Sequence, residues 1–319
     1  MKTSIYICIL FLTLVNLSCS SDDTEPVAEP QPIVTTFIVE NYNTQNEPNT
    51  VTLRKTYTVE NNKIIASQRE SLETGSSGHK IYAYENDRIS EISNFSDGLL
   101  IEKKHFTYDD DGHLIEYFRE ITENSSPQAL YIKSNYIHTQ DTIYSIASQS
   151  TDGITYETNY TSKIVLDSNL NAIFTESTGI STDYTNRTIH TYDSNNNIIS
   201  SMGYELIDNG TFFNTISSTY TYETGINTLG IIYDATFGRE VLMLSSQHQD
   251  NSSALNNYNS KYKTFNTFDT YDSSFFGNVD MAAEFINTYN EQNYSTLSDY
   301  RMIIEGDIFS RFTIEYIFE

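Results

Sequence analysis

The sequence contains no tryptophan, two cysteines, five prolines and few basic side chains, with 18 Lys and Arg against 43 Asp and Glu in 319 residues. Nucleic acids and anionic membrane surfaces are bound through clustered Lys and Arg, so a formal net charge of −25 argues against both kinds of partner. The scarcity of proline, together with 25 Tyr and 17 Phe, excludes a wholly disordered chain. The abundance of Tyr, Thr and Ile indicates instead a β-rich fold with polar faces.

The first 18 residues have the features of a sorting signal. Lys2 supplies a positive start, and residues 5–17 form an apolar run of 13 residues, too short to span a bilayer as a helix. The run ends at Ser18 and Cys19, a junction that resembles the signal of bacterial lipoproteins, where cleavage precedes an acylated cysteine. This resemblance implies removal of residues 1–18 and lipidation of Cys19, for example with palmitate. An ordinary secretory signal followed by a chance cysteine is the alternative.

Cysteine usage agrees with a lipid anchor. Cys8 lies within the signal, so Cys19 would be the single thiol of the exported chain. An odd cysteine in an exported protein needs an explanation, and acylation supplies one. Neither a disulfide nor a cysteine-based metal site is then expected.

Residues 19–33 are predicted to form an acidic, proline-containing tether before a single domain over residues 34–319. Residues 20–25 are polar or acidic, so this part of the tether has nothing with which to build a core. An acidic cluster directly after the acylated cysteine resembles the surface-export signal of Bacteroidetes lipoproteins. The resemblance implies an outer-membrane protein that is lipid-anchored and faces the cell exterior. The alternative is a lipoprotein on the periplasmic face with an ordinary acidic linker.

Turn signals recur about every 12 to 16 residues from residue 34 to residue 225. Asp-Gly and Asn-Gly pairs favour tight hairpins because primed turns require positive φ. The examples include Asp97-Gly98, Asp111-Gly112, Asp152-Gly153 and Asn209-Gly210. Strands of roughly 9 to 11 residues remain between the turns with no helix separating them, so the pattern predicts an antiparallel meander.

A short motif accompanies these turns: an aromatic residue, any residue, Tyr and an acid, then a polar turn and Ile or Leu. The clearest copy consists of Phe106, Tyr108, Asp109, Gly112 and Leu114. Degenerate copies occupy residues 82–89 and 190–198, and weaker ones occupy residues 57–64 and 220–223. We expect the two aromatic side chains to share one face at the strand end and the acid to cap the turn through backbone N–H groups. The aliphatic residue then starts the next strand.

The motif resembles the tyrosine-aspartate (YD, Rhs-like) repeat. Residues 50–225 also resemble a family of Bacteroidetes lipoproteins of unknown function with a porin-like β fold. The copies lack the strict Gly and Arg of true Rhs repeats, and the chain is too short for an Rhs shell. The resemblance therefore implies an architecture and brings no known activity.

The last third of the sequence is less regular. Residues 245–260 are rich in Asn, Ser and Gln, which predicts an exposed loop. Apolar residues at 279, 282, 283 and 286 follow helical spacing after Asn278, so a short helix is expected over residues 279–290. Residues 301–304 and 312–318 are predicted to form a closing hairpin. The expected fold class is thus all-β: a long antiparallel meander of hairpin repeats, curled into an open or closed barrel, with one short helix near the C-terminus.

The sequence shows no catalytic or cofactor-binding constellation. Six histidines are spread along the chain without i+2 or i+4 partners, so no metal site is predicted, although histidines facing each other across neighbouring strands stay open. Residues 109–112 lack the alternating ligands and distal Glu of an EF-hand loop, which favours a hairpin turn over calcium binding. Asp141-Thr142-Ile143 resembles the O-glycosylation acceptor motif of Bacteroidetes exported proteins, which makes Thr142 a candidate modification site.

These observations predict a non-enzymatic, lipid-anchored cell-envelope protein that binds a glycan or an envelope protein, or that serves structurally. Its partners would be the membrane, through the lipid anchor, and that ligand. Surface Tyr could stack on sugar rings, but Tyr at strand ends could equally pack against cross-strand neighbours. A carbohydrate-active enzyme with carboxylates inside a barrel and a transmembrane barrel are the alternatives.

Overall fold

The computed structural model describes residues 32–44, 49–122, 129–180, 184–206, 210–244, 265–272 and 279–319. Residues 33–319 form one unit, separate from residues 1–32. Within residues 265–272 and 279–280 only the backbone is described. The predicted loop over residues 245–260 lies outside the described residues, as does Cys19.

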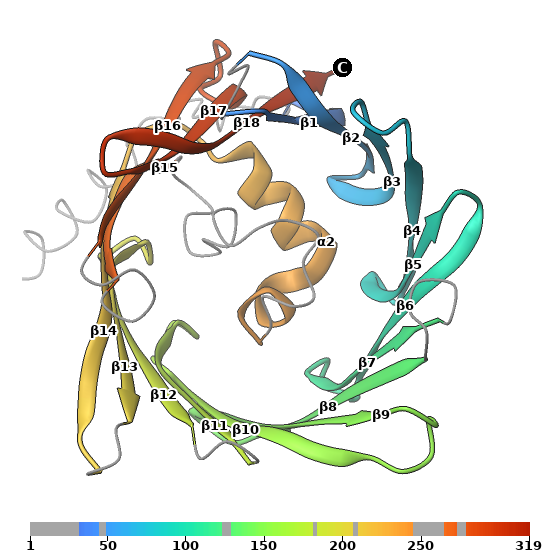
Figure 1. The fold of residues 1–319 in the computed structure, drawn as a ribbon, viewed down its shortest axis with the longest axis vertical. Coiled ribbons are helices and arrows are strands. Elements are labelled where there is room, and N and C mark those ends of the chain that lie inside the picture. Colours follow the sequence, from blue (N-terminus) through green and yellow to red (C-terminus); the bar gives the residue numbers. More distant parts are fainter. Residues whose placement is uncertain are drawn as a thin grey trace, which may run out of the picture. The chain divides into compact units, whose positions relative to one another are not determined.

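In the described part of the chain, eighteen strands follow one another in an antiparallel meander, interrupted once by a helix (Figure 1). The strands are β1 (Val34–Tyr42), β2 (Val51–Glu60), β3 (Lys63–Ser71), β4 (Ser77–Glu85), β5 (Arg88–Ser96), β6 (Leu99–Tyr108), β7 (Leu114–Ile121), β8 (Leu130–His138), β9 (Thr142–Ser150), β10 (Glu157–Leu166), β11 (Ala172–Gly179), β12 (Thr185–Tyr192), β13 (Ile198–Leu206), β14 (Phe212–Tyr222), β15 (Phe265–Asp272), β16 (Val279–Tyr289), β17 (Ser295–Ile304) and β18 (Asp307–Phe318). The predicted all-β meander is confirmed.

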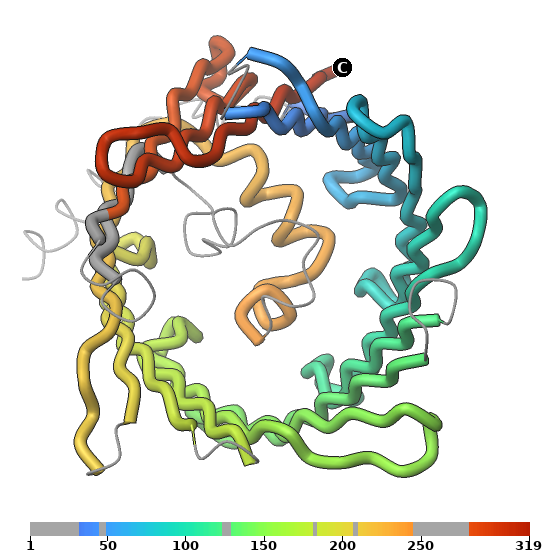
Figure 2. The backbone as a smooth tube through the Cα atoms, viewed as in Figure 1, coloured from blue at the N-terminus to red at the C-terminus, as the bar shows by residue number. Residues whose placement is uncertain are grey.

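The sheet closes on itself. Each strand pairs with its neighbours in the chain, and β1 pairs with both β2 and β18. Figure 2 shows the last strand, in red, returning beside the first, in blue. Of the two arrangements expected from the sequence, the closed one is formed. The predicted closing hairpin is β17 and β18, which pair antiparallel.

Two kinds of tight turn recur in the meander, and the sequence indicated examples of both. Two-residue turns with positive φ at both positions are found at Asn61-Asn62, Asn86-Asp87, Asp97-Gly98 and Glu305-Gly306. This backbone twist matches the twist of antiparallel strands, which is why Asn, Asp and Gly dominate these positions. A second, wider turn carries the repeat motif.

The wider turn spans five residues and is capped by its first side chain. Between β6 and β7, the N–H of His113 donates to Asp109 Oδ1 at 2.8 Å, and Gly112 takes a φ of 90°. The same arrangement recurs with Asp167, Asp193 and Asn290 as the capping residue. The predicted capping role of the repeat's acid is therefore confirmed for Asp109 and Asp193, whereas the copy over residues 82–89 has the two-residue turn Asn86-Asp87.

Apolar side chains of the strands gather on the inner face of the closed sheet. Phe37 is fully buried and stacks on Tyr57, with ring centroids 4.3 Å apart. Tyr300 stacks on Phe312 in the same manner at 4.4 Å. The repeat motif follows this pattern, because Phe106 and Leu114 are also buried.

The outer face carries ion pairs at several places around the sheet, most of them between neighbouring strands, here called the outer ion pairs. They are Arg54–Glu40, Lys103–Glu91, Lys133–Glu116, Arg187–Glu176, and Arg301 and Arg311 with Asp299. In most of these strands, the charged side chains point to the opposite face of the sheet from the buried apolar side chains. Polar and charged groups thus interrupt the apolar residues of the outer surface.

The expectation of a helix over residues 279–290 is wrong, because these residues form strand β16. Ala283 and Phe285 are buried while Ile286 is 48 % exposed, which is the period-two pattern of a strand. The strand conformation is supported by pairing with β15 on one side and β17 on the other. The local apolar spacing is compatible with both a helix and a strand, and pairing with the two neighbouring strands stabilises the strand.

The helix of the fold is α2 (Thr228–Leu244), inserted between β14 and β15. Its residues Leu229, Ile232, Phe237 and Val241 are buried, at helical spacing. The helix lies within the ring of strands in Figure 1 and contacts β3 and β5. It is kinked at Gly238, whose φ of 73° breaks the helical geometry. No helix in the described ranges has the length and apolar character needed to cross a membrane.

Candidate functional site

The inner face of β2 to β7 carries a group of basic residues, here called the basic wall: Lys55, Arg69, Lys80, Lys104 and Arg119. The pairing register brings them together, because Lys55 lies opposite Arg69 and Lys104 lies opposite Arg119. Lys80 stands between them, opposite Ser67 on one side and Asn94 on the other. Each belongs to the same face as a buried residue of its strand, such as Tyr57 or Phe106.

On this described inner face, the basic wall has one carboxylate, that of Glu102. Asn94 Nδ2 donates to Glu102 Oε2 at 3.4 Å, Lys104 Nζ lies 3.9 Å from the same oxygen, and Arg119 Nε donates to Oε1. Burial opposes ionisation of Glu102, but Lys104 and Arg119 outweigh it and hold the pKa of the carboxyl below its usual range. Five cations against one anion leave the basic wall with a formal charge of about +4.

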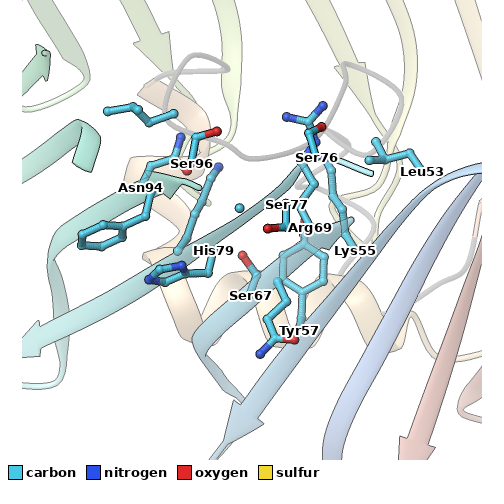
Figure 3. Close-up of a pocket in the computed structure, with 15 residues that line it drawn as sticks. Leu53, Lys55, Tyr57, Ser67, Arg69, Ser76, Ser77, His79, Asn94 and Ser96 are labelled. Carbon is cyan, nitrogen blue, oxygen red and sulfur yellow. The ribbon is translucent and has the colours of Figure 1, made fainter. Parts of the chain in front are cut away.

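A cavity of about 310 Å³ opens onto the basic wall (Figure 3). Its lining includes Lys55, Arg69 and Lys80 together with the hydroxyls of Ser67 and Ser96. This volume is at the lower end of the range of small-molecule sites, about 300–1,000 Å³. Cations and hydroxyl groups around one cavity suit a ligand that combines an anionic group with several hydroxyls.

A glycine keeps part of this cavity free of side chains. Gly78 is in the lining, and a Cβ atom at this position would lie 2.7 Å from the carbonyl oxygen of Phe95. Such an approach to backbone is too close for any other residue without movement of the strand. The close pairing of β4 and β5 therefore requires glycine here.

The tyrosines of the repeat have mainly a structural role. Tyr84, Tyr192 and Tyr222 donate hydroxyl hydrogen bonds of 2.6–2.7 Å to backbone carbonyl oxygens at the start of an earlier strand. Burial raises the pKa of the Tyr84 and Tyr222 phenols. Cross-strand packing, rather than an exposed stacking surface for sugars, describes these residues.

The remaining residues singled out from the sequence are placed as follows. Phe106, Tyr108, Asp109, Gly112 and Leu114 form one strand end, its turn and the next strand start, as expected. Thr142 begins β9 and is 7 % exposed. Its hydroxyl donates to Asp141 Oδ1 at 2.9 Å, so a glycan would have to be attached before this strand folds.

The sequence contains a signal for the basic wall that lies outside the repeat motif. Lys55, Lys80 and Lys104 each stand two residues before the first aromatic residue of a repeat copy, namely Tyr57, Tyr82 and Phe106. A spacing of two in a strand puts lysine and aromatic residue on the same face. Arg69 and Arg119 carry no such signal, because they join the basic wall only through the register of the neighbouring strands.

Comparison with known proteins gives no family assignment. No family model matches the chain, and no curated protein matches it. Among solved structures, it is similar to a porin-like protein from Bacteroides vulgatus ATCC 8482, with 11 % identity, coverage of 90 % of this chain and 99 % of that chain, and a TM-score of 0.41. A porin-like protein from Bacteroides uniformis ATCC 8492 gives 10 % identity, 91 % and 99 % coverage, and a TM-score of 0.33.

A third likeness is to the complex TcdB2-TccC3, with 8 % identity and a TM-score of 0.36 over 80 % of this chain and 13 % of that chain. All three TM-scores are below 0.5, so these likenesses carry no argument about function. The functional conclusion has to come from the residues of the chain itself.

Proposed function

We propose that this chain is a lipid-anchored protein of the cell envelope, tethered through Cys19, whose closed sheet binds an anionic glycan at the basic wall. The observation that carries the proposal is the uneven distribution of positive and negative side chains. A chain with a net charge of −25 presents five cations and one carboxylate on one inner surface beside a cavity of about 310 Å³. The signal-like residues 1–18 and the junction at Cys19 support the anchor and the envelope location.

The ligand class follows from the groups around the cavity. Lys and Arg side chains make charge-assisted hydrogen bonds to carboxylate and sulfate oxygens. Serine hydroxyls such as those of Ser67 and Ser96 can donate to and accept from sugar hydroxyls. A short oligosaccharide with uronic acid or sulfate groups fits both requirements.

The outer face favours a protein that is anchored by lipid over one that spans the membrane with its strands. A lipid-facing surface needs a continuous apolar band, and a Lys or Arg at the bilayer midplane costs about 2–4 kcal/mol. The outer ion pairs would place several such charges in that band. Exposed apolar residues such as Ile137 on β8 and Phe213 on β14 belong to the same sheet as these charges.

The inner carboxylate does not support the alternative of a carbohydrate-active enzyme. A general acid in glycoside hydrolysis needs a raised pKa so that it carries a proton at neutral pH. The pKa of Glu102 is instead lowered by Lys104 and Arg119, and both of these cations contact it. Glu102 is therefore suited to hold the basic side chains in position, and we propose a binding role without catalysis.

Isothermal titration calorimetry of the full chain in detergent tests the proposal. The probes are an oligosaccharide with uronic acid groups, a sulfated oligosaccharide and a neutral one of the same length. We expect saturable binding of an anionic probe, weakened by salt, and little heat from the neutral one. Equal binding of all three, or binding of none, would contradict the assigned ligand class. If the ligand is instead a protein, the other partner expected from the sequence, none of the three sugars should produce heat of binding.

A pair of variants locates the binding surface. Lys80→Gln removes a cation that lines the cavity, and we expect about a tenfold loss of affinity, equivalent to about 1.4 kcal/mol. Lys103→Gln is the matched control, because Lys103 lies on the outer face and pairs there with Glu91. Equal losses in the two variants would show that the sugar responds to total charge and that the basic wall is not its site.

A further inference from the structure

Two histidines and a glutamate from three separate elements meet at the end of the sheet where α2 enters. His113 belongs to the turn between β6 and β7, His138 ends β8, and Glu240 lies on α2 after the kink. Their candidate ligand atoms all lie within 4.8 Å of one another. We propose that His113, His138 and Glu240 form a binding site for a divalent cation of the zinc class, which ties α2 to the sheet.

The distances between the ligand atoms are close to those around a tetrahedral ion. His113 Nδ1 lies 3.0 Å from Glu240 Oε2, and His138 Nε2 lies 3.8 Å from Glu240 Oε1. Two ligands with bonds of about 2.1 Å at a tetrahedral angle are separated by roughly 3.4 Å, which falls between these values. Since no two ligand atoms of the group are more than 4.8 Å apart, side-chain rearrangements of about an ångström would bring the three side chains onto one ion.

The ligand types select the class of metal. Two imidazoles and one carboxylate form a donor set that suits Zn²⁺ and related transition-metal ions. Ca²⁺ and Mg²⁺ prefer sites made of oxygen atoms alone. The side chain of His113 is 49 % exposed, so an ion can enter from solvent and keep a water molecule as a further ligand.

The repeat itself shows that the fold does not require these histidines. At the place of His138, the strands that end at Tyr84, Tyr192 and Tyr222 have tyrosines, and these donate to backbone carbonyl oxygens as His138 Nε2 does to Leu114 O at 2.9 Å. At the place of His113, the turns capped by Asp167 and Asp193 have asparagine. At both positions the residue that differs from these copies is a histidine, and both histidines face the same carboxylate. The two rings also stack, with centroids 4.8 Å apart.

Glu240 already joins the helix to this region without an ion. Its Oε1 accepts a hydrogen bond of 2.5 Å from the N–H of Leu114, which holds the carboxylate in place beside the two rings. An ion would replace the proton that His113 Nδ1 shares with Glu240 and the one that His138 Nε2 gives to Leu114 O. The consequence is a metal-dependent attachment of the second half of α2 to β7 and β8.

The test is a Zn²⁺ titration of the full chain, without a histidine tag and after dialysis against a chelator. We expect one Zn²⁺ per chain by calorimetry, with Ca²⁺ and Mg²⁺ giving no comparable heat. His113→Asn and His138→Tyr introduce the residues that the repeat uses elsewhere, so the fold should be retained and can be checked by circular dichroism. Each variant should weaken Zn²⁺ binding at least tenfold, and the double variant should abolish it.

Two further measurements separate this site from adventitious binding. His79→Asn is the control, because the His79 ring stacks on Phe95 on β5, away from Glu240, and it should leave the titration unchanged. Zn²⁺ should raise the melting temperature of the natural chain and leave that of the double variant where it was. Zn²⁺ binding that cannot be saturated, or that survives in the folded double variant, would overturn the proposal.

Discussion

The pH dependence of stability should depend strongly on one buried histidine, His190 on β12. Its ring lies on the inner face, where Nδ1 is 2.8 Å from Ser201 Oγ, and Tyr220 donates to the same oxygen at 3.3 Å. Burial lowers the pKa of His190 to about 4, against an ordinary value of about 6.5. The folded chain therefore keeps this imidazole neutral over a range in which the unfolded chain protonates it.

The sign of the effect follows from the two proton affinities. Between about pH 6.5 and pH 4 the unfolded state binds more protons at this residue, so stability falls as the pH is lowered. Each pKa unit corresponds to about 1.36 kcal/mol, so a shift of about 2.5 units is worth about 3 kcal/mol in full. Between pH 7 and pH 5 the expected loss from this single group is about 2 kcal/mol.

The assay is urea unfolding of the natural chain and of His190→Gln at pH 8, 7, 6 and 5. Glutamine keeps a polar, uncharged side chain at this position, and every other titrating group is shared by the two proteins. The difference in unfolding free energy should be constant from pH 8 to pH 7 and then move by about 2 kcal/mol in favour of the variant by pH 5. A difference that stays constant down to pH 5 would refute the argument that this ring is desolvated.

Three further predictions concern the anchor and the helix. Cys19→Ala should abolish incorporation of labelled palmitate and move the protein from the membrane fraction to the aqueous fraction after cell disruption. Thr236→Val should cost about 1–3 kcal/mol in urea unfolding, because it removes the Oγ1 that accepts the buried N–H of Ile64 at 3.0 Å; an unchanged midpoint would contradict docking of α2 at β3. Gly238→Ala should cost about 1–3 kcal/mol, since its φ of 73° is strained for any other residue and no neighbouring atom lies within 4 Å of the added carbon. A smaller loss there would mean that the kink can straighten.

The meander could be predicted from the sequence because its turns are local. Asp97-Gly98 and the turn from Asp109 to His113 are specified by residues that are adjacent in the chain, and the structure has both. The helix could not be placed in the same way. Residues 279–289 have an apolar spacing that fits a helix, but they pair with two strands that lie before and after them in the sequence.

The candidate sites depend on contacts that no local pattern encodes. Lys55 and Arg69 meet because β2 and β3 pair in one register, and a shift of β3 by one residue would turn Arg69 away from the inner face. His113 and Glu240 are separated by 127 residues, and α2 has to enter the ring of strands before they can meet. The departure of His113 and His138 from the repeat was visible in the sequence, whereas their common partner was not.

Closure of the sheet changes the significance of the large negative charge. An open meander would need charged edges to avoid pairing with other copies, but β1 and β18 pair with each other and leave no free edge among the described strands. The charges are distributed unevenly instead: outer cations such as Arg54 and Lys103 pair across strands with carboxylates, whereas Glu102, the carboxylate of the basic wall, pairs with Lys104 and Arg119. At physiological salt the Debye length is about 8 Å, so an anion at the basic wall is influenced mainly by its five cations. A long polyanion would also lie against the negative exterior, and we therefore expect this surface to favour short anionic oligosaccharides or the ends of longer chains.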